Sequence, residues 1–234
     1  MSSQDAFENP FLARYGSRFA FIDGHCRYYA SRDATQGVSS GQLSPAQAAQ
    51  LADEIGWAKL EQYSAFADGT SCTDGGGSVV SAGTLAFYCD CACDDDAPTG
   101  LADAIAASGK WTKTLADQGA PLDGPVRVLA LETGVPQDQA QPWLLSRDLA
   151  EFVSATTDPA FWTATGLLVE DSADAAALRQ LRANAVDAFF HLSQPVYVWS
   201  GDLTAQLFIR DELPAQAEAA ITAFDERTRA ATAR

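Results

Sequence analysis

Alternating apolar and polar positions along this chain predict three β-hairpins. Strand-like runs flank short turn sequences at Asp23-Gly24, Ala82-Gly83 and Ser200-Gly201-Asp202. The Asp23-Gly24 pair is typical of a two-residue type I′ turn. We therefore expect hairpins over 19–30, 79–93 and 196–210, and the alternating run at 125–131 predicts a further strand.

Apolar positions three and four residues apart predict four longer helices. The start of the first helix is the best defined: Ser44 is suited to cap it, Pro45 to the first helical position, and Gln47 to complete a capping box. The helices are expected over 44–57, 99–118, 172–192 and 214–231.

Hairpins that alternate with helices favour an α+β fold, in which antiparallel sheets pack with amphipathic helices, over a parallel doubly wound sheet. The segment 132–142 holds two prolines and few apolar residues, so it is the best internal boundary. We expect a tail at 1–17 and two subdomains. The first, 18–132, is α+β and contains the cysteine cluster, and the second, 133–234, is α+β and helix-rich.

The charge balance narrows the classes of partner. The 234 residues include 31 acidic and 15 basic side chains, a net charge of −16, while 47% apolar residues supply a core. Such a surface repels phosphate backbones and anionic lipids, so we expect neither a nucleic acid nor a membrane as partner. It suits a basic protein or peptide. The alternative is that the charge only keeps the protein in solution.

The first twelve residues lack the basic region and apolar run of a leader, so the chain as given predicts a cytoplasmic protein. Five cysteines favour the alternative, an exported form whose leader has been removed. These two observations point in opposite directions, and the missing leader is the basis of the prediction.

Three of the five cysteines lie close together at Cys89, Cys91 and Cys93. On a strand these thiols share one face with Leu85 and Phe87, because side chains alternate. Three interpretations stay open: one or two disulfides, for example from Cys72 to one of the three, inert buried thiols, or a metal or reactive-thiol site. The metal hypothesis names Cys72, Cys89, Cys91 and Cys93 as zinc ligands, although no C-x-x-C pair is present.

Two further features are candidate partner-binding sites. Asp94, Asp95 and Asp96 form an acidic run just before a predicted helix, where carboxylates interact favourably with the helix dipole. Their spacing does not match a calcium loop. Trp143 follows a proline in the connecting segment, and such a tryptophan either plugs the core or anchors an interface.

Common catalytic motifs are missing from the sequence. The chain has two histidines, and His25 and Cys26 point to opposite faces of a strand, so they cannot form a nucleophile–base pair. We therefore name no catalytic residue and no cofactor, and expect a non-enzymatic binding or accessory protein that presents an acidic surface to a protein or peptide. The alternative is a metal-binding or thiol-redox protein. A third hypothesis is an enzyme that uses carboxylates as acids or bases.

Overall fold

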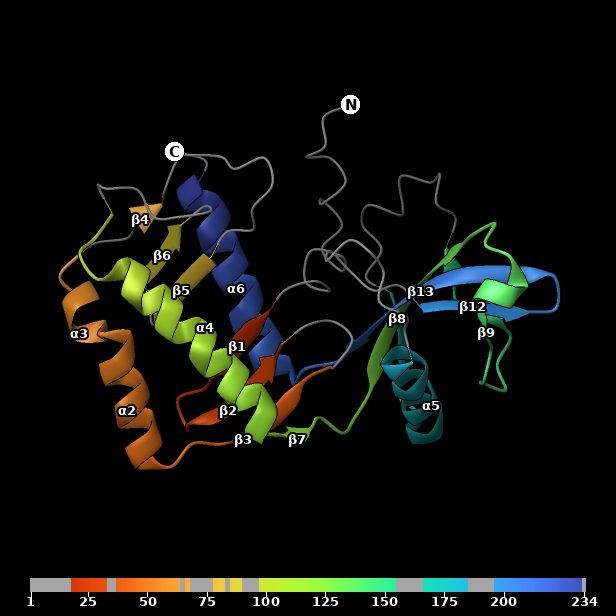
Figure 1. Ribbon diagram of the computed structural model, residues 1–234, viewed down its shortest axis with the longest axis horizontal. Coiled ribbons are helices and arrows are strands. Elements are labelled where there is room, and N and C mark those ends of the chain that lie inside the picture. Colours follow the sequence, from red (N-terminus) through yellow and green to blue (C-terminus); the bar gives the residue numbers. More distant parts are fainter. Residues whose placement is uncertain are drawn as a thin grey trace. The chain divides into compact units, whose positions relative to one another are not determined.

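The fold is α+β, as the sequence predicts: helices pack with sheets whose longest strand pairs are antiparallel. The computed structural model describes residues 18–32, 37–63, 66–67, 78–82, 85–89, 97–154, 166–184 and 196–232. The chain divides into two compact units, and each is described by itself (Figure 1). Unit 1 comprises 1–19, 31–39 and 120–212, and unit 2 comprises 20–30, 40–119 and 213–234.

Unit 1 is built on a mixed sheet in the order β10-β8-β13-β12-β9, with β11 also paired to β8. Its strands are β8 (Val126–Glu132), β9 (Gln141–Pro142), β10 (Val153–Ser154), β11 (Leu167–Val169), β12 (Val196–Ser200) and β13 (Leu203–Asp211). Two short 3₁₀ helices, η2 (Gln137–Gln139) and η3 (Leu149–Glu151), connect them. The predicted hairpin at 196–210 is β12–β13. Gly201 has a φ of 59°, which fits the first central position of a two-residue type II′ turn.

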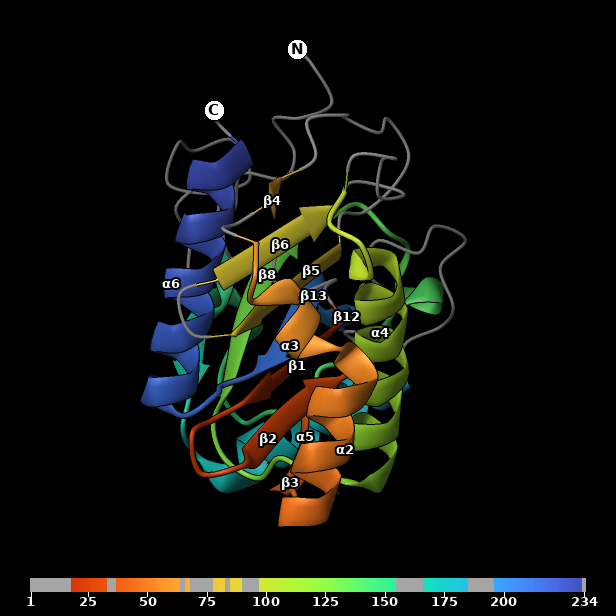
Figure 2. The ribbon, with the colours of Figure 1, turned by 90° about the vertical axis from the view of Figure 1, so that its left-hand side faces the viewer.

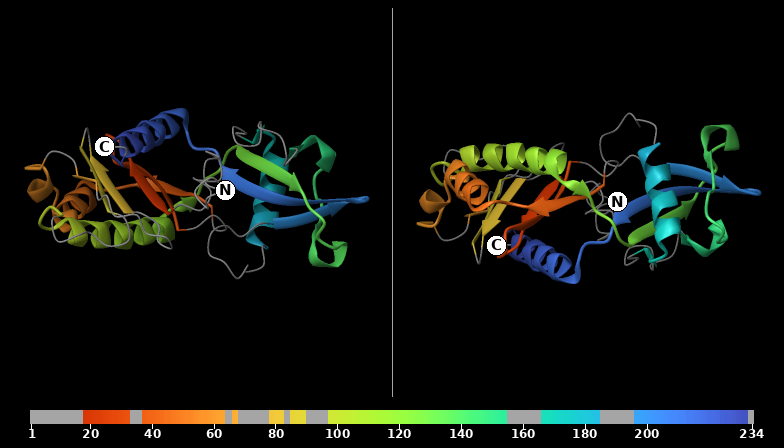
Figure 3. Two further views of the ribbon diagram at one scale, coloured as in Figure 1. Left: turned by 90° about the horizontal axis from the view of Figure 1, so that it is seen from above. Right: turned by 90° about the horizontal axis from the view of Figure 1, so that it is seen from below.

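Helix α5 (Ser172–Ala183) covers one face of this sheet (Figure 3). The Asp171 carboxylate caps it by accepting hydrogen bonds from the N–H groups of Ala173 and Asp174. Alternate residues of β8 and β13 face the helix and form an apolar core with Leu178 and Leu181. The core also includes Val126, Val128, Ala130, Leu149, Phe152, Val169, Val196, Val198, Ala205, Leu207 and Ile209.

A buried ionic cluster fixes the end of β13. The Asp211 carboxylate is 2% exposed and accepts from Nε of Arg179 at 2.7 Å and from Nη2 of Arg182 at 2.9 Å. It also accepts from the backbone N–H of Val38 at 2.9 Å. Gly37 has a φ of 75° and brings the backbone against Arg182. One carboxylate thus links the 37–38 segment, the sheet and α5.

Unit 2 contains two small sheets. The first is formed by β1 (Phe19–Ile22), β2 (Arg27–Ser31) and β3 (Ser39–Gln42), in that order. The short strand β7 (Ala120–Pro121) belongs to unit 1. The second has the order β4-β6-β5, formed by β4 (Phe66–Ala67), β5 (Ser78–Ala82) and β6 (Leu85–Cys89). The helices are α2 (Pro45–Ile55), α3 (Trp57–Leu60), α4 (Leu101–Gln118) and α6 (Ala215–Thr232).

Helix α4 serves both sheets of unit 2. Its first turns place Leu101 and Ala104 against Phe87 of β6, and its last turns place Trp111 and Leu115 against Tyr28 of β2. Helix α6 lies on the other side of these sheets (Figure 2). Helix α2 flanks α4 and contributes Ala48 and Leu51 to the edge of the core, although none of its residues is fully buried.

The capping box is confirmed: the Ser44 side chain accepts from Gln47 N–H, and the Gln47 side chain accepts from Ser44 N–H. The helix expected over 44–57 ends at Gly56, whose φ is 68°, and α3 follows it. Glycine adopts this left-handed conformation without a steric cost, so the break occurs there.

The type I′ turn predicted at Asp23-Gly24 is wrong. Cys26 N–H bonds to the Asp23 carbonyl, and Cys26 has a φ of 61°, while Gly24 has no positive φ. The hairpin therefore closes by a type I turn followed by a left-handed residue. The Asp23 carboxylate accepts from the N–H groups of His25 and Arg27, which favours this longer turn.

The grouping of the chain differs from the expected division at residue 133. Strand β8, expected in the first subdomain, pairs along its length with β13 from the second. Helix α6, expected in the second, belongs to unit 2.

The hairpins at 19–30 and 79–93 are β1–β2 and β5–β6, with 90–93 outside the described residues. The helix expected over 172–192 is described to Ala183.

Candidate functional site

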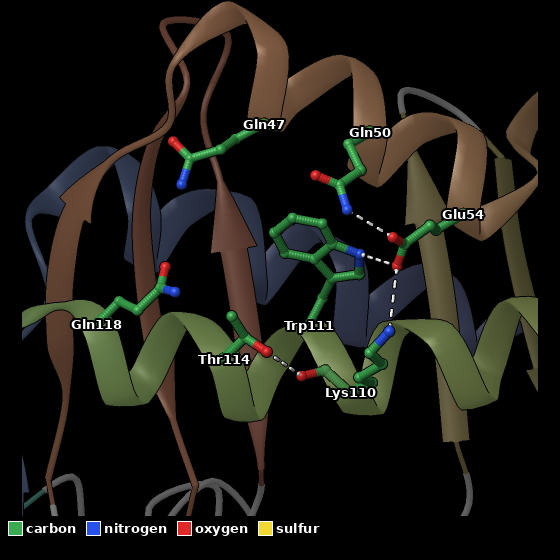
Figure 4. Close-up of a pocket in the computed structure, with 7 residues that line it drawn as sticks. All are labelled: Gln47, Gln50, Glu54, Lys110, Trp111, Thr114 and Gln118. Carbon is green, nitrogen blue, oxygen red and sulfur yellow. Dashed lines mark hydrogen bonds and ion pairs between the residues drawn. The ribbon is translucent and has the colours of Figure 1, made fainter.

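A groove of about 230 Å³ runs between α2 and α4 in unit 2 (Figure 4). Side chains three and four residues apart line it from both helices, so each helix presents one row of its surface. The α2 row is Gln47, Gln50 and Glu54, and the α4 row is Lys110, Trp111, Thr114 and Gln118. The helices run in opposite directions, because Glu54 meets Lys110 while Gln47 lies toward the Gln118 end.

Glu54 joins the two helices through its carboxylate. Oε1 accepts from the Gln50 amide at 2.8 Å, and Oε2 accepts from the indole N–H of Trp111 at 2.9 Å. Nζ of Lys110 lies 3.8 Å from the same oxygen. Trp111 is 8% exposed, so its buried N–H needs this acceptor. On the core side of these polar contacts, Leu51 of α2 packs against the cluster that contains Trp111.

Hydrogen bonding keeps Glu54 ionised. The bond from the Gln50 amide, together with those from Trp111 and Lys110, holds the pKa of Glu54 below its ordinary value, and partial desolvation only opposes this. A carboxylate that accepts hydrogen bonds is favoured over the neutral acid.

We predict that acid loosens the contact between α2 and α4. The depressed pKa of Glu54 means that its contribution to stability is complete above the pKa of the unfolded chain and is lost as pH falls through the folded pKa. Glu54→Gln should therefore lower the urea midpoint at pH 7 and lose this effect at pH 3. The indole N–H resonance of Trp111 should move over the same pH range in the wild type. If the difference in urea midpoint between wild type and variant stays constant from pH 7 to pH 3, the prediction is contradicted.

Three side-chain carboxamides in the groove have N–H or C=O groups that make no hydrogen bond to the described residues. Gln47 uses its oxygen to accept from Ser44, so its NH₂ group is available. Gln50 donates to Glu54, which leaves its carbonyl oxygen available. Gln118, the last residue of α4, makes no side-chain hydrogen bond within the described part of the chain. The groove therefore offers both neutral hydrogen-bond donors and neutral hydrogen-bond acceptors.

Most of the sequence-predicted site residues fall outside the described ranges. These are Cys72, Cys91 and Cys93 of the proposed metal site and Asp94, Asp95 and Asp96 of the acidic run. Cys89 is described: it is 3% exposed and shares its face of β6 with buried Phe87, as the alternation predicts. Cys89 is bonded in a disulfide whose partner is not among the described residues, and Cys26 is a free thiol.

Described residues of two neighbouring strands lie close to Cys89. Ala67 of β4 pairs with Tyr88, and Ser78 of β5 pairs with Cys89 on the other side of β6. Neighbouring strands lie about 4.8 Å apart, so Ala67 and Ser78, the described residues that precede and follow 68–77 in the sequence, both lie close to the end of β6. Cys72 belongs to this segment, and the predicted pairing with it stays a prediction.

Trp143 is half-buried in unit 1 and packs against the core. Its ring meets Phe152 edge-on at 5.1 Å, and its indole N–H donates to the carbonyl of Arg147 at 2.7 Å. The Arg147 guanidinium lies 4.7 Å from the Phe152 ring. These contacts are typical of a side chain that fills a space at the edge of the core. The neighbouring Leu144 is 46% exposed and is the more accessible apolar side chain. Partner binding through Trp143 stays a prediction.

Two features of the described residues bear on the other predictions. No group of three His, Cys, Asp or Glu side chains among them is arranged to hold a metal ion, and Cys72, Cys91 and Cys93 lie outside these residues. No helix in the same ranges has both the length and the apolar character needed to cross a membrane.

Reasoning from the sequence missed the groove. Its two rows lie more than fifty residues apart, and nothing in the sequence pairs α2 with α4. A local signal was present: Gln47, Gln50 and Glu54 repeat at helical spacing, as do Trp111, Thr114 and Gln118. Comparison of the chain with protein-family models, with curated proteins and with solved structures found no match.

Proposed function

We propose that the protein is a non-enzymatic binding or accessory protein that presents an acidic surface to a basic protein or peptide. The observation that carries the proposal is the distribution of charge in unit 2. Residues 61–109 include eight acidic residues and no lysine or arginine. Unit 2 as a whole has fifteen acids and seven bases, so this segment accounts for its whole net charge of −8.

An uncompensated charge of this size acts mainly on the rate of encounter. A field of one sign raises the local concentration of an oppositely charged partner and speeds association, and salt weakens it. At 0.15 M ionic strength the screening length is about 8 Å, so only nearby acids act together. Association that falls steeply with salt is therefore the expected behaviour.

We predict that reversing Asp94, Asp95 and Asp96 to lysine slows association with a fluorescent octalysine peptide about tenfold or more at low salt. The matched control reverses three exposed acids of unit 1, Glu132, Asp138 and Asp202, which changes the net charge equally. Stopped-flow rates at several salt concentrations measure the effect. If both triple variants slow association equally, the charge acts as a whole and the acidic run is not a binding surface.

The second candidate function is a metal-binding or thiol-redox role for Cys72, Cys89, Cys91 and Cys93. The burial of Cys89 and its disulfide favour a structural cross-link over a reactive thiol, because reactive thiols are exposed. Intact mass before and after alkylation, with metal analysis, separates the two roles. A structural cross-link predicts metal-free protein whose peptide map joins Cys89 to Cys72. Bound zinc released by a chelator would support the second candidate.

A further inference from the structure

The α2–α4 groove carries an arrangement of polar groups that the packing of the two helices does not use. Glu54, Trp111 and Lys110 satisfy one another at one end. The carbonyl of Gln50 lies beside this cluster, and the NH₂ group of Gln47 and the whole carboxamide of Gln118 lie toward the other end (Figure 4). These groups are uncharged and include both donors and acceptors.

A peptide main chain complements such groups. Each residue of an extended chain offers one N–H donor and one carbonyl acceptor, and a side-chain carboxamide can bond to both at once. The α2 row from Gln47 to Glu54 spans seven helical steps, or about 10 Å. An extended chain advances about 3.3 Å per residue, so the row matches about three residues.

The state of Trp111 disfavours a sugar or a nucleobase as the ligand. Such ligands bind by stacking on the exposed face of an aromatic ring. Trp111 is 8% exposed, and its indole N–H is already donated to Glu54. The groove thus offers hydrogen bonds without a stacking surface.

We propose that the α2–α4 groove binds about three residues of an extended basic segment of the partner through its main chain, with Gln118 and Gln50 bonding to backbone amides. The exposed Asp53, next in sequence to Glu54, would face a basic side chain of that segment, whereas Asp117, next to Gln118, already pairs with Lys113 at 3.1 Å. This inference deepens the proposed function and rests on its basic partner. The proposed function concerns the encounter with the partner, whereas this inference names the contact that holds the partner after encounter.

The test uses the full chain and two blocked probes, acetyl-Lys-Ala-Lys-amide and its analogue in which an ester replaces the amide that follows alanine. The two have the same charges and side chains, but the ester lacks one N–H donor. Side-chain amide and indole resonances report binding. We expect the ester to bind about threefold to tenfold more weakly, the effect of losing one neutral hydrogen bond. The resonances of Gln118, Gln50 and Trp111 should move with peptide concentration.

Gln118→Met should weaken the peptide by a similar factor and bring the two probes close to equal affinity. Methionine has nearly the same size and helix propensity, and Gln118 is exposed at the end of α4, so the fold is retained. The matched control is Gln139→Met, an exposed glutamine of unit 1, which should change nothing. If peptide and ester bind the wild type equally, or if the peptide does not bind, the proposal that the groove binds a peptide main chain is overturned. Salt-sensitive binding of octalysine that persists in Gln118→Met would then leave the acidic surface as the binding site.

Discussion

Asp211→Asn should lower the free energy of unfolding of unit 1 by about 3–5 kcal/mol. The carboxylate is buried and accepts from Arg179, from Arg182 and from the N–H of Val38. Asparagine replaces one of the two acceptor oxygens with an NH₂ donor. At least one of the N–H groups that now donate to Asp211 would then face this NH₂ group instead of an acceptor. It also leaves the charge of Arg182, which is 5% exposed, without a counter-ion.

Urea denaturation followed by circular dichroism measures this effect. Asp202→Asn provides the control, because Asp202 is exposed in the β12–β13 turn and its change should stay within about 0.5 kcal/mol. If the two variants lose similar stability, the Asp211 cluster does not hold the unit together.

Gly37→Ala should destabilise the same unit by about 3 kcal/mol or more, although it deletes no side-chain atom. The φ of 75° costs an L-residue about 1–2 kcal/mol. The added methyl group would overlap Nη2 of Arg182 and lie 2.6 Å from Oδ2 of Asp211. The rest of the cost comes from displacing this buried ion pair.

Gly134→Ala is the matched control for Gly37. A methyl group there meets no atom within 4 Å, and its φ is not positive. Thermal unfolding of both variants compares them directly. Equal melting temperatures would show that the 37–38 segment moves away from Arg182 at little cost.

Local signals in the sequence predicted the elements whose causes are local. Ser44, Pro45 and Gln47 define the start of α2 because all their hydrogen bonds lie within one turn. The Gly201 turn and the alternation of β8 are of the same kind. The Asp23 turn was mistaken because its side chain bonds to two later N–H groups, which a dipeptide rule does not include.

Long-range pairings were beyond the sequence. Strand β8 and strand β13 lie side by side although more than seventy residues separate them, and their alternation fits many other partners equally well. The Asp211 cluster depends on this pairing, since it joins residues 37–38, 179, 182 and 211. The groove depends likewise on the packing of α2 against α4. A single sequence shows the rows of each helix but not which rows meet.

The β8–β13 pairing also constrains how the chain can fold during synthesis. Translation adds about 5–20 residues per second, so the 79 residues from Glu132 to Asp211 take roughly 4–16 s to be made. Until then β8 has no β13 to cover its edge, although its Val126, Val128 and Leu129 are almost fully buried in the finished protein. Unit 2 must wait as well, because α6 is its last helix. Ribosome-bound nascent chains should therefore expose an apolar strand edge for seconds, which makes them targets for chaperones.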